Sequence, residues 1–232
     1  MRHKESGNKT NHCVIFDMDG TLWNTLDVIV GCWNYAFTKF EKTRGKSITQ
    51  AELVPHMGKT MTRFAADMLP ELTEEEAVAI MEVCTEEENT RLTDQGAILY
   101  DGVEKTFRTL AAKGCRIGIV SNCQSGYIDA FLKHYRLEEL VDDFRCWGDD
   151  PSGKAANIRT LIERNHADSA VYVGDTQGDY EACQAAGVPF IYAAYGFGTV
   201  AAEVPRINSL RELPSLWDRL EEYRAVTHRN MP

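Results

Sequence analysis

Two aspartates, Asp17 and Asp19, lie two residues apart at the end of a short apolar segment, residues 13–17 (CVIFD). The apolar run predicts a buried strand, and Gly20 permits the backbone to turn sharply after it. Such a turn can curl around an anion, and its carboxylates can hold a cation. Taken alone, the string Asp-Met-Asp-Gly-Thr is compatible with a structural turn, a calcium loop or a catalytic site.

Three further polar segments accompany predicted elements. Ser121 and Asn122 end a second strand, Lys154 begins a helix, and residues 174–179 (GDTQGD) follow a third strand. In parallel sheets, ligands bind beyond the carboxyl ends of the strands. We therefore expect the polar groups that follow these strands to lie on one rim, although they are far apart in the chain.

That rim requires a parallel sheet. After about residue 97, strand-like apolar runs alternate with amphipathic helical stretches. This alternation is typical of a parallel sheet with helices on both faces. The predicted strands cover residues 116–121, 170–174 and 189–193, with a weaker one near residue 144. The sequence therefore predicts an α/β fold with a doubly wound, Rossmann-like parallel sheet.

Residues 24–96 show a different pattern, which predicts an inserted, small all-helical cap domain. Apolar residues recur at three-and-four spacing from Leu26, and Thr49 with Glu52 and Thr73 with Glu76 have capping-box spacing. The run of glutamates at 86–88 is interpreted as the solvated face of a cap helix. The predicted organisation is a flexible tail at 1–11, an α/β core at 12–23 and 97–232, and the cap at 24–96.

Composition excludes several classes of protein. The 232-residue chain is 44% hydrophobic and has a formal net charge of -10, which disfavours nucleic acid as a partner. We find no apolar run long enough to cross a membrane and no secretory signal in the first eleven residues. The seven cysteines are scattered and odd in number, which favours a reducing, cytoplasmic location. The oligomeric state is left open.

Taken in order, the four polar segments resemble the four motifs of the haloacid dehalogenase superfamily of phosphohydrolases. The resemblance extends from Cys13 to Gly198. The helical insertion just after the first motif is similar to the small cap of the phosphoglycolate phosphatase and β-phosphoglucomutase branch. The resemblance implies a phosphatase that hydrolyses a small phosphorylated metabolite.

The resemblance also implies a role for each matching residue. Asp17 is expected to attack phosphorus and form an aspartyl-phosphate. Asp19 is expected to protonate the leaving oxygen and then to deprotonate the attacking water. The groups expected to contact the phosphate are Asp17, Met18, Asp19, Ser121, Asn122 and Lys154. Ser121 would hydrogen-bond a phosphoryl oxygen, and Lys154 would neutralise charge on the transferring group.

Two carboxylates beside a phosphate dianion need a cation, and Mg²⁺ prefers hard oxygen ligands of this kind. By the resemblance, its ligands are the carboxylates of Asp17 and Asp175 and the backbone carbonyl of Asp19. Asp179, four residues after Asp175, is expected to support the site by holding a metal-bound water or Lys154.

Substrate choice is expected to depend on the cap, where Lys59 and Arg63 are the candidates for contact with a second anionic group. A sugar phosphomutase shares every motif above, but relatives of that kind carry a cap histidine where this chain has Ile29. A phosphonate hydrolase would need Lys59 as a Schiff-base partner. A catalytically silent protein that binds a phosphorylated metabolite is the remaining alternative. Phosphatase is favoured over phosphomutase because of Ile29, and over a silent binding protein because Asp17, Asp19, Lys154 and Asp175 are all present.

Overall fold

A computed structural model of the chain describes residues 11–219. Of the predicted tail at residues 1–11, all but Asn11 lies outside the described residues. The last part of the predicted core, residues 220–232, also lies outside them.

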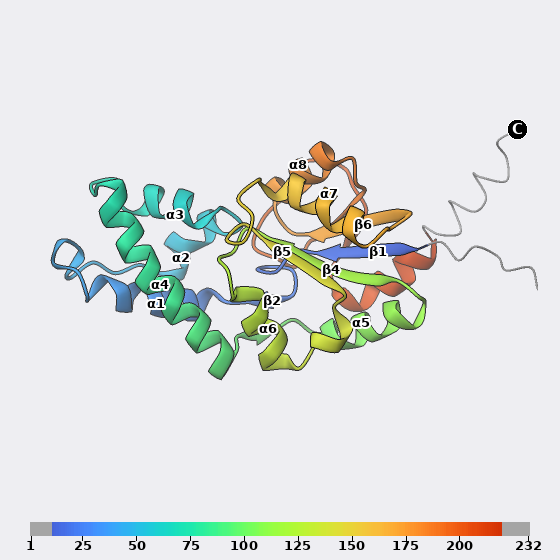
Figure 1. Cartoon of the computed structure of the whole chain (residues 1–232), viewed down its shortest axis with the longest axis horizontal. Helices are drawn as coiled ribbons and strands as arrows, with labels where there is room; N and C mark the ends of the chain where they lie inside the picture. The colour runs from blue at the N-terminus through green and yellow to red at the C-terminus, as the bar shows by residue number, and fades with distance from the viewer. Residues whose placement is uncertain (1–10, 220–232) are drawn as a thin grey trace, which may run out of the picture.

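The core is a six-stranded parallel sheet in the order β5-β4-β1-β6-β7-β8 (Figure 1). Central strand β1 pairs with β4 and β6, so that Phe16 lies opposite Ile119 and Val173. The sheet strands are β1 (His12–Phe16), β4 (Arg116–Ser121), β5 (Asp143–Cys146), β6 (Ser169–Gly174), β7 (Phe190–Ala193) and β8 (Arg206–Ile207). This register brings the carboxyl ends of β1, β4 and β6 to one edge of the sheet.

Alternate residues of the strands pack against helices on opposite faces, as expected for a sheet buried on both sides. Val14 and Phe16 belong to the apolar cluster that includes residues of α5 (Val103–Ala112) and α6 (Tyr127–Tyr135). Cys13 and Ile15 belong to the cluster on the face of α7 (Lys154–Arg164) and α8 (Gln177–Ala186). The predicted α/β class is confirmed, with two helix layers around one sheet (Figure 1).

Four helices between β2 and β3 form what we call the helical module. They are α1 (Leu26–Phe37), α2 (Gln50–Leu53), α3 (Met61–Met68) and α4 (Glu74–Gln95). They enclose an apolar cluster of their own, which includes Trp33, Phe64 and Ile80. Both predicted capping boxes are present, at the starts of α2 and α4. The described residues also include short 3₁₀ turns: η1 (Glu41–Thr43), η2 (Val54–His56), η3 (Glu138–Leu140) and η4 (Leu210–Glu212).

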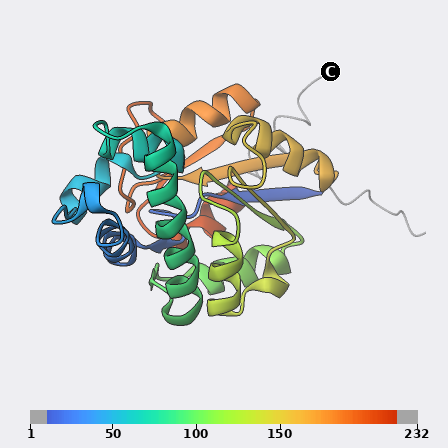
Figure 2. The same ribbon diagram turned by 60° about the vertical axis from the view of Figure 1, so that its left-hand side comes forward.

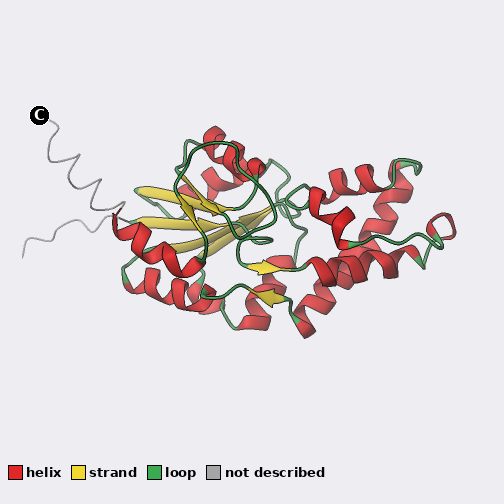
Figure 3. Ribbon diagram, turned by 180° about the vertical axis from the view of Figure 1, so that it is seen from behind, coloured by secondary structure: helices red, strands yellow, loops and turns green. Residues whose placement is uncertain are grey.

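A two-stranded antiparallel ribbon joins the module to the core (Figure 3). Strand β2 (Trp23–Asn24) pairs with β3 (Ile98–Leu99), so that the two chain crossings lie side by side. This ribbon was not predictable from the sequence, because strands of two residues carry no periodic signal.

Helix α4 extends beyond the module and lies against α6 of the core (Figure 2). At this contact the Asn89 side-chain amide donates to the carbonyl of Ser125 at 2.8 Å. The module is therefore held against the core by the side of α4 as well as by the ribbon.

None of the helices within residues 11–219 combines the length and the apolar composition needed to cross a membrane. All seven cysteines lie in the described part of the chain, and each is a buried free thiol.

Candidate active site

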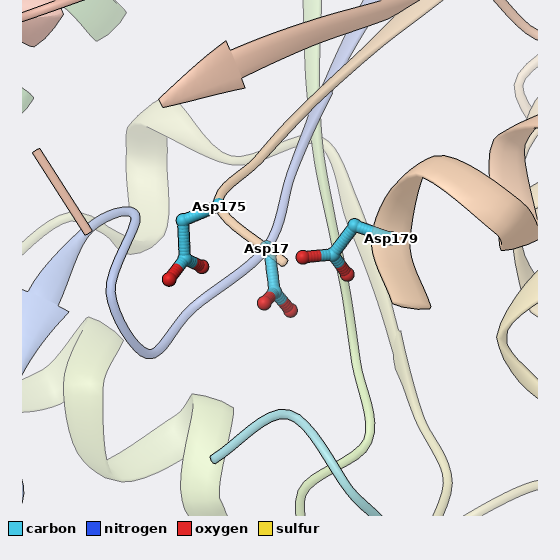
Figure 4. A group of neighbouring side chains, drawn as sticks. All are labelled: Asp17, Asp175 and Asp179. Carbon is cyan, nitrogen blue, oxygen red and sulfur yellow. The ribbon is translucent and has the colours of Figure 1, made fainter. Parts of the chain in front are cut away.

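Three aspartates converge at the carboxyl edge of the sheet. Asp17 follows β1, Asp175 follows β6, and Asp179 lies in the first turn of α8. Oxygen atoms of the three carboxylates lie within 4.8 Å of one another, and all three side chains are buried. Figure 4 shows Asp17 between the other two. We call these three residues the acid cluster.

Lys154, the first residue of α7, supplies positive charge to the acid cluster. Its Nζ lies 2.9 Å from Oδ1 of Asp17 and 2.5 Å from Oδ1 of Asp179. Burial alone would lower the pKa of Lys154, but the two carboxylates raise it well above its ordinary value. The lysine therefore remains charged and fixes two of the three acids.

One ammonium group does not balance three buried carboxylates. Burial raises the pKa of Asp17 to about 7, the charge of Asp179 adds to this, and Lys154 opposes it. Burial and the other two acids raise the pKa of Asp175 well above its ordinary value, although the Phe197 and Gly198 amides donate to its Oδ2 at 2.8 and 3.2 Å. Converging oxygen ligands with excess negative charge fit a hard divalent cation such as Mg²⁺.

Glycines make room for the acid cluster. A Cβ atom at Gly20, where φ is +80°, would lie 2.2 Å from Oδ2 of Asp175. A Cβ atom at Gly196 would lie 2.3 Å from Cβ of Asp175, and one at Gly174 would lie 2.8 Å from Cγ of Asp179. Any larger residue at these three positions would displace a carboxylate.

Asp19 is held separately from the acid cluster. Its Oδ1 accepts hydrogen bonds from Thr25 Oγ1 at 2.6 Å and from the Tyr127 hydroxyl at 2.8 Å. Burial raises the pKa of Asp19, and the two hydroxyls oppose the shift. A carboxyl group that is easier to protonate than usual suits a general acid and base. Sequence reasoning missed Thr25 and Tyr127, because neither belongs to a motif.

The predicted phosphate contacts lie around the same point. Ser121 is the last residue of β4 and is buried, and the side-chain amide of Asn122 donates to the Gly58 carbonyl of the module at 2.8 Å. The Met18 side chain is buried and its carbonyl accepts from the Leu22 amide at 2.7 Å. Met18 therefore shapes the turn after β1 with its backbone.

A cleft of about 50 Å³ lies between the module and the carboxyl edge of the sheet. Asp17, Asp19 and Ser121 face it from the core. Its apolar walls come mainly from the module: Ile29, Trp33, Leu53, Met57, Met61 and Phe64. The two parts of the chain thus enclose one site.

The two candidates for substrate choice differ in position. Lys59 lines the cleft, but its Nζ lies 2.9 Å from Oδ2 of Asp67 and 3.2 Å from Nδ1 of His56. Arg63 is not among the residues that line the cleft; its Nε pairs with Oδ1 of Asp67 at 3.1 Å, and its side chain is 71% exposed. Both cations are therefore engaged by the same carboxylate.

The prediction that glutamates 86–88 form a solvated face is wrong for Glu88, which is buried. Its side chain is 1% exposed and lines the cleft, whereas Glu86 is exposed. Cys84 Sγ and Gln124 Nε2 donate to it at 3.3 and 2.9 Å. The signal was present in the sequence: the buried stripe of α4 passes through Ile80, Cys84 and Leu92, and position 88 continues it at four-residue spacing.

Comparisons with known proteins identify the family of the chain. Residues 14–193 match the model of the haloacid dehalogenase-like hydrolase family. A phosphoglycolate phosphatase from Xylella fastidiosa is 30% identical over 204 residues, which is 83% of this chain and 84% of that protein. Pyrophosphatase PpaX from Listeria monocytogenes is 26% identical over 175 residues, 73% of this chain and 76% of that protein.

Among solved structures, CbbY from Rhodobacter sphaeroides in complex with phosphate superposes with a TM-score of 0.73. The alignment covers 87% of this chain and 95% of that chain, with 19% sequence identity. This likeness shows that the fold is shared.

Proposed function

The chain belongs to the haloacid dehalogenase-like hydrolase family, and we propose that it is a Mg²⁺-dependent phosphatase that hydrolyses small phosphate monoesters through an aspartyl-phosphate on Asp17. The names of the phosphoglycolate phosphatase and pyrophosphatase relatives support this chemistry. The observation that carries the proposal is that Asp17, fixed by Lys154, faces the same cleft as Asp19, whose carboxyl pKa is raised.

In the first half-reaction, a carboxylate oxygen of Asp17 attacks phosphorus while the bond from phosphorus to the leaving oxygen breaks. Asp19 gives its proton to that oxygen, which leaves as an alcohol. In the second half-reaction, Asp19 takes a proton from water as the water attacks the acyl phosphate. Orthophosphate leaves and the Asp17 carboxylate is restored. Lys154 and the Ser121 hydroxyl stabilise charge on the transferring group.

The residues that would hold Mg²⁺ are Asp17 and Asp175 through their carboxylates and Asp19 through its backbone carbonyl. Asp179 supports them by holding Lys154 at 2.5 Å. The bound cation supplies the positive charge that allows a phosphate dianion to approach a carboxylate nucleophile. Lys154 alone does not balance the three buried carboxylates of the acid cluster. We therefore propose a metal ion, and not a second lysine, as the source of the missing positive charge.

The helical module acts as the cap in this proposal. It excludes bulk water from the acyl phosphate and provides the walls that meet the leaving group. Seven free thiols suit a reducing compartment, and we place the enzyme in the cytoplasm.

The test is the substitution Asp17→Asn, assayed by phosphate release from a panel of small esters with Mg²⁺. An amide is a poor nucleophile, so we expect turnover to fall by roughly 10³-fold or more. Asp94→Asn, at an exposed position of α4, is the matched control and should retain full activity. Circular dichroism checks that both variants fold. Substantial activity in folded Asp17→Asn would exclude the covalent mechanism.

A further inference from the structure

Glu88 is a buried acid in the cleft for which the proposed chemistry has no use. Burial raises its pKa to about 7, and hydrogen bonds from Gln124 and Cys84 oppose this only in part. A carboxylate offers about four acceptor positions. The two donors occupy two of them, so Glu88 retains capacity to accept hydrogen bonds from a molecule in the cleft.

The charges around the cleft are unfavourable for a second anion. Three acids line it, namely Asp17, Asp19 and Glu88. The lysine that lines it, Lys59, is already paired with Asp67. Lys154 is bound by the acid cluster. Among the described residues, no other lysine or arginine lines the cleft. A leaving group with its own carboxylate would face Glu88 unless Lys59 left Asp67, which it shares with Arg63.

The rest of the module's wall is apolar and suits a compact organic leaving group. Trp33 is fully buried and packs edge-on against Phe64, with 4.5 Å between ring centroids. The Trp33 indole lies close enough to Glu88 to oppose the rise in its pKa, although Nε1 of Trp33 makes no hydrogen bond of acceptable geometry. Glu88 is thus a hydrogen-bond acceptor set into an apolar wall.

We propose that Glu88 determines specificity by accepting a hydrogen bond from a hydroxyl or ammonium group on the leaving group, and that it selects against esters that carry a second anion. The proposal rests on the proposed phosphatase function and narrows its substrate class. It sets this chain apart from the acid substrate named for the phosphoglycolate phosphatase relative.

Four two-carbon esters test it at pH 8, where Glu88 is mostly ionised, because they differ only in the group at the far carbon. They are 2-hydroxyethyl phosphate, O-phosphoethanolamine, ethyl phosphate and 2-phosphoglycolate. We expect kcat/KM of the wild-type enzyme for the hydroxyl or the ammonium ester to exceed that for phosphoglycolate by about tenfold or more. Glu88→Gln should reduce this ratio by about tenfold if the donor is ammonium, and by about threefold if it is hydroxyl. Either result supports the proposal and identifies the donor.

Glu86→Gln is the matched control, since it makes the same change on an exposed turn of the same helix and should preserve the ratio. A wild-type preference for phosphoglycolate over both donor esters would overturn the proposal, as would an unaltered ratio in folded Glu88→Gln. If Glu88→Gln does not fold, the wild-type preference alone decides.

Hydrolysis of para-nitrophenyl phosphate distinguishes failure of the Glu88 proposal from failure of the proposed phosphatase function. If the enzyme cleaves this aryl ester but shows no preference for donor-bearing esters, only the role of Glu88 falls. If it cleaves no ester at all with Mg²⁺ present, the phosphatase function falls with it.

Discussion

At the scale of single residues, Lys154 and the acid cluster bury charges at a cost to stability. The ammonium group of Lys154 binds Asp17 and Asp179, and all three side chains are buried. Burying charged groups is costly unless each is paired, and here Asp175 has no cationic partner within the described residues. A core selected for stability alone would not hold this set of charges, which supports a functional reason for it.

Glu88 gives a residue-scale prediction with a definite sign. Its folded-state pKa, about 7, lies above the ordinary value of 4.5. The folded protein therefore binds the proton more tightly than the unfolded chain, and stability is lost as pH rises from 4.5 to 7. Above this window Glu88→Gln removes the cost of ionising a buried carboxyl. We expect it to raise the free energy of unfolding at pH 8 by roughly 1 to 3 kcal/mol more than at pH 5.

Urea denaturation of wild type and Glu88→Gln at the two pH values measures this difference. Asp17, whose pKa burial also raises to about 7, is common to both proteins and cancels in the comparison. Glu86→Gln, on the exposed side of the helix, should show no pH-dependent gain. If Glu88→Gln gains nothing at pH 8 relative to pH 5, the buried carboxyl does not titrate as described.

The convergence of the candidate site residues was predictable because residue type and position gave the same answer. Asp17, Ser121 and Asp175 each stand at the end of an apolar run, and the parallel register brings those ends together. Tyr127 was not predictable. Its hydroxyl reaches Asp19 only because α6 packs beside the turn after β1, and a single tyrosine in a helix carries no sign of that contact.

At the scale of elements, the loop after η2 connects the module to the core. The Gly58 carbonyl accepts from Asn122, the residue after β4. A Cβ atom at Gly58 would lie 3.2 Å from Thr176 Cγ2, and its φ is +79°. Thr176 caps α8, where Asp179 is placed. A change at Gly58 should therefore disturb the two core segments that carry Asn122 and Asp179.

We expect Gly58→Ala to lower kcat/KM by roughly tenfold, from left-handed strain and the close contact with Thr176. Gly45→Ala is the matched control: its φ is +87°, but nothing lies within 4 Å of the added Cβ atom. It should carry the same strain in the module and keep its activity. Steady-state kinetics and thermal unfolding of both variants distinguish the two effects. Equal kinetic losses would mean that strain alone is responsible.

The longer strands were predictable from the sequence, and the shortest were not. The long apolar runs of β1, β4 and β6 were predicted. The two-residue strands β2, β3 and β8 were missed. Their pairing is decided by tertiary contacts, because two residues cannot show the alternation that identifies a strand.

At the scale of the whole molecule, the module and the sheet have separate apolar clusters and meet across the cleft. A cleft of about 50 Å³ holds only a few water molecules. A phosphate ester with an organic leaving group is larger, so the module must separate from the core to admit it. Both chain crossings between the module and the core lie side by side in the ribbon of β2 and β3, so such a movement would bend the chain there.

Metal binding at the acid cluster, as proposed, would also stabilise the whole chain, whose net charge is -10. A cation that binds the folded state alone stabilises it by about 2.7 kcal/mol at a hundredfold excess over Kd, which should raise Tm by roughly 5 °C or more.

Asp175→Asn removes one of the three buried charges. It should raise Tm without metal and abolish the rise with Mg²⁺, as measured by differential scanning calorimetry with and without chelator. KCl at matched ionic strength controls for screening, because it should affect wild type and variant alike. An equal Mg²⁺-dependent rise in both proteins would place the cation on the general acidic surface and not in the acid cluster.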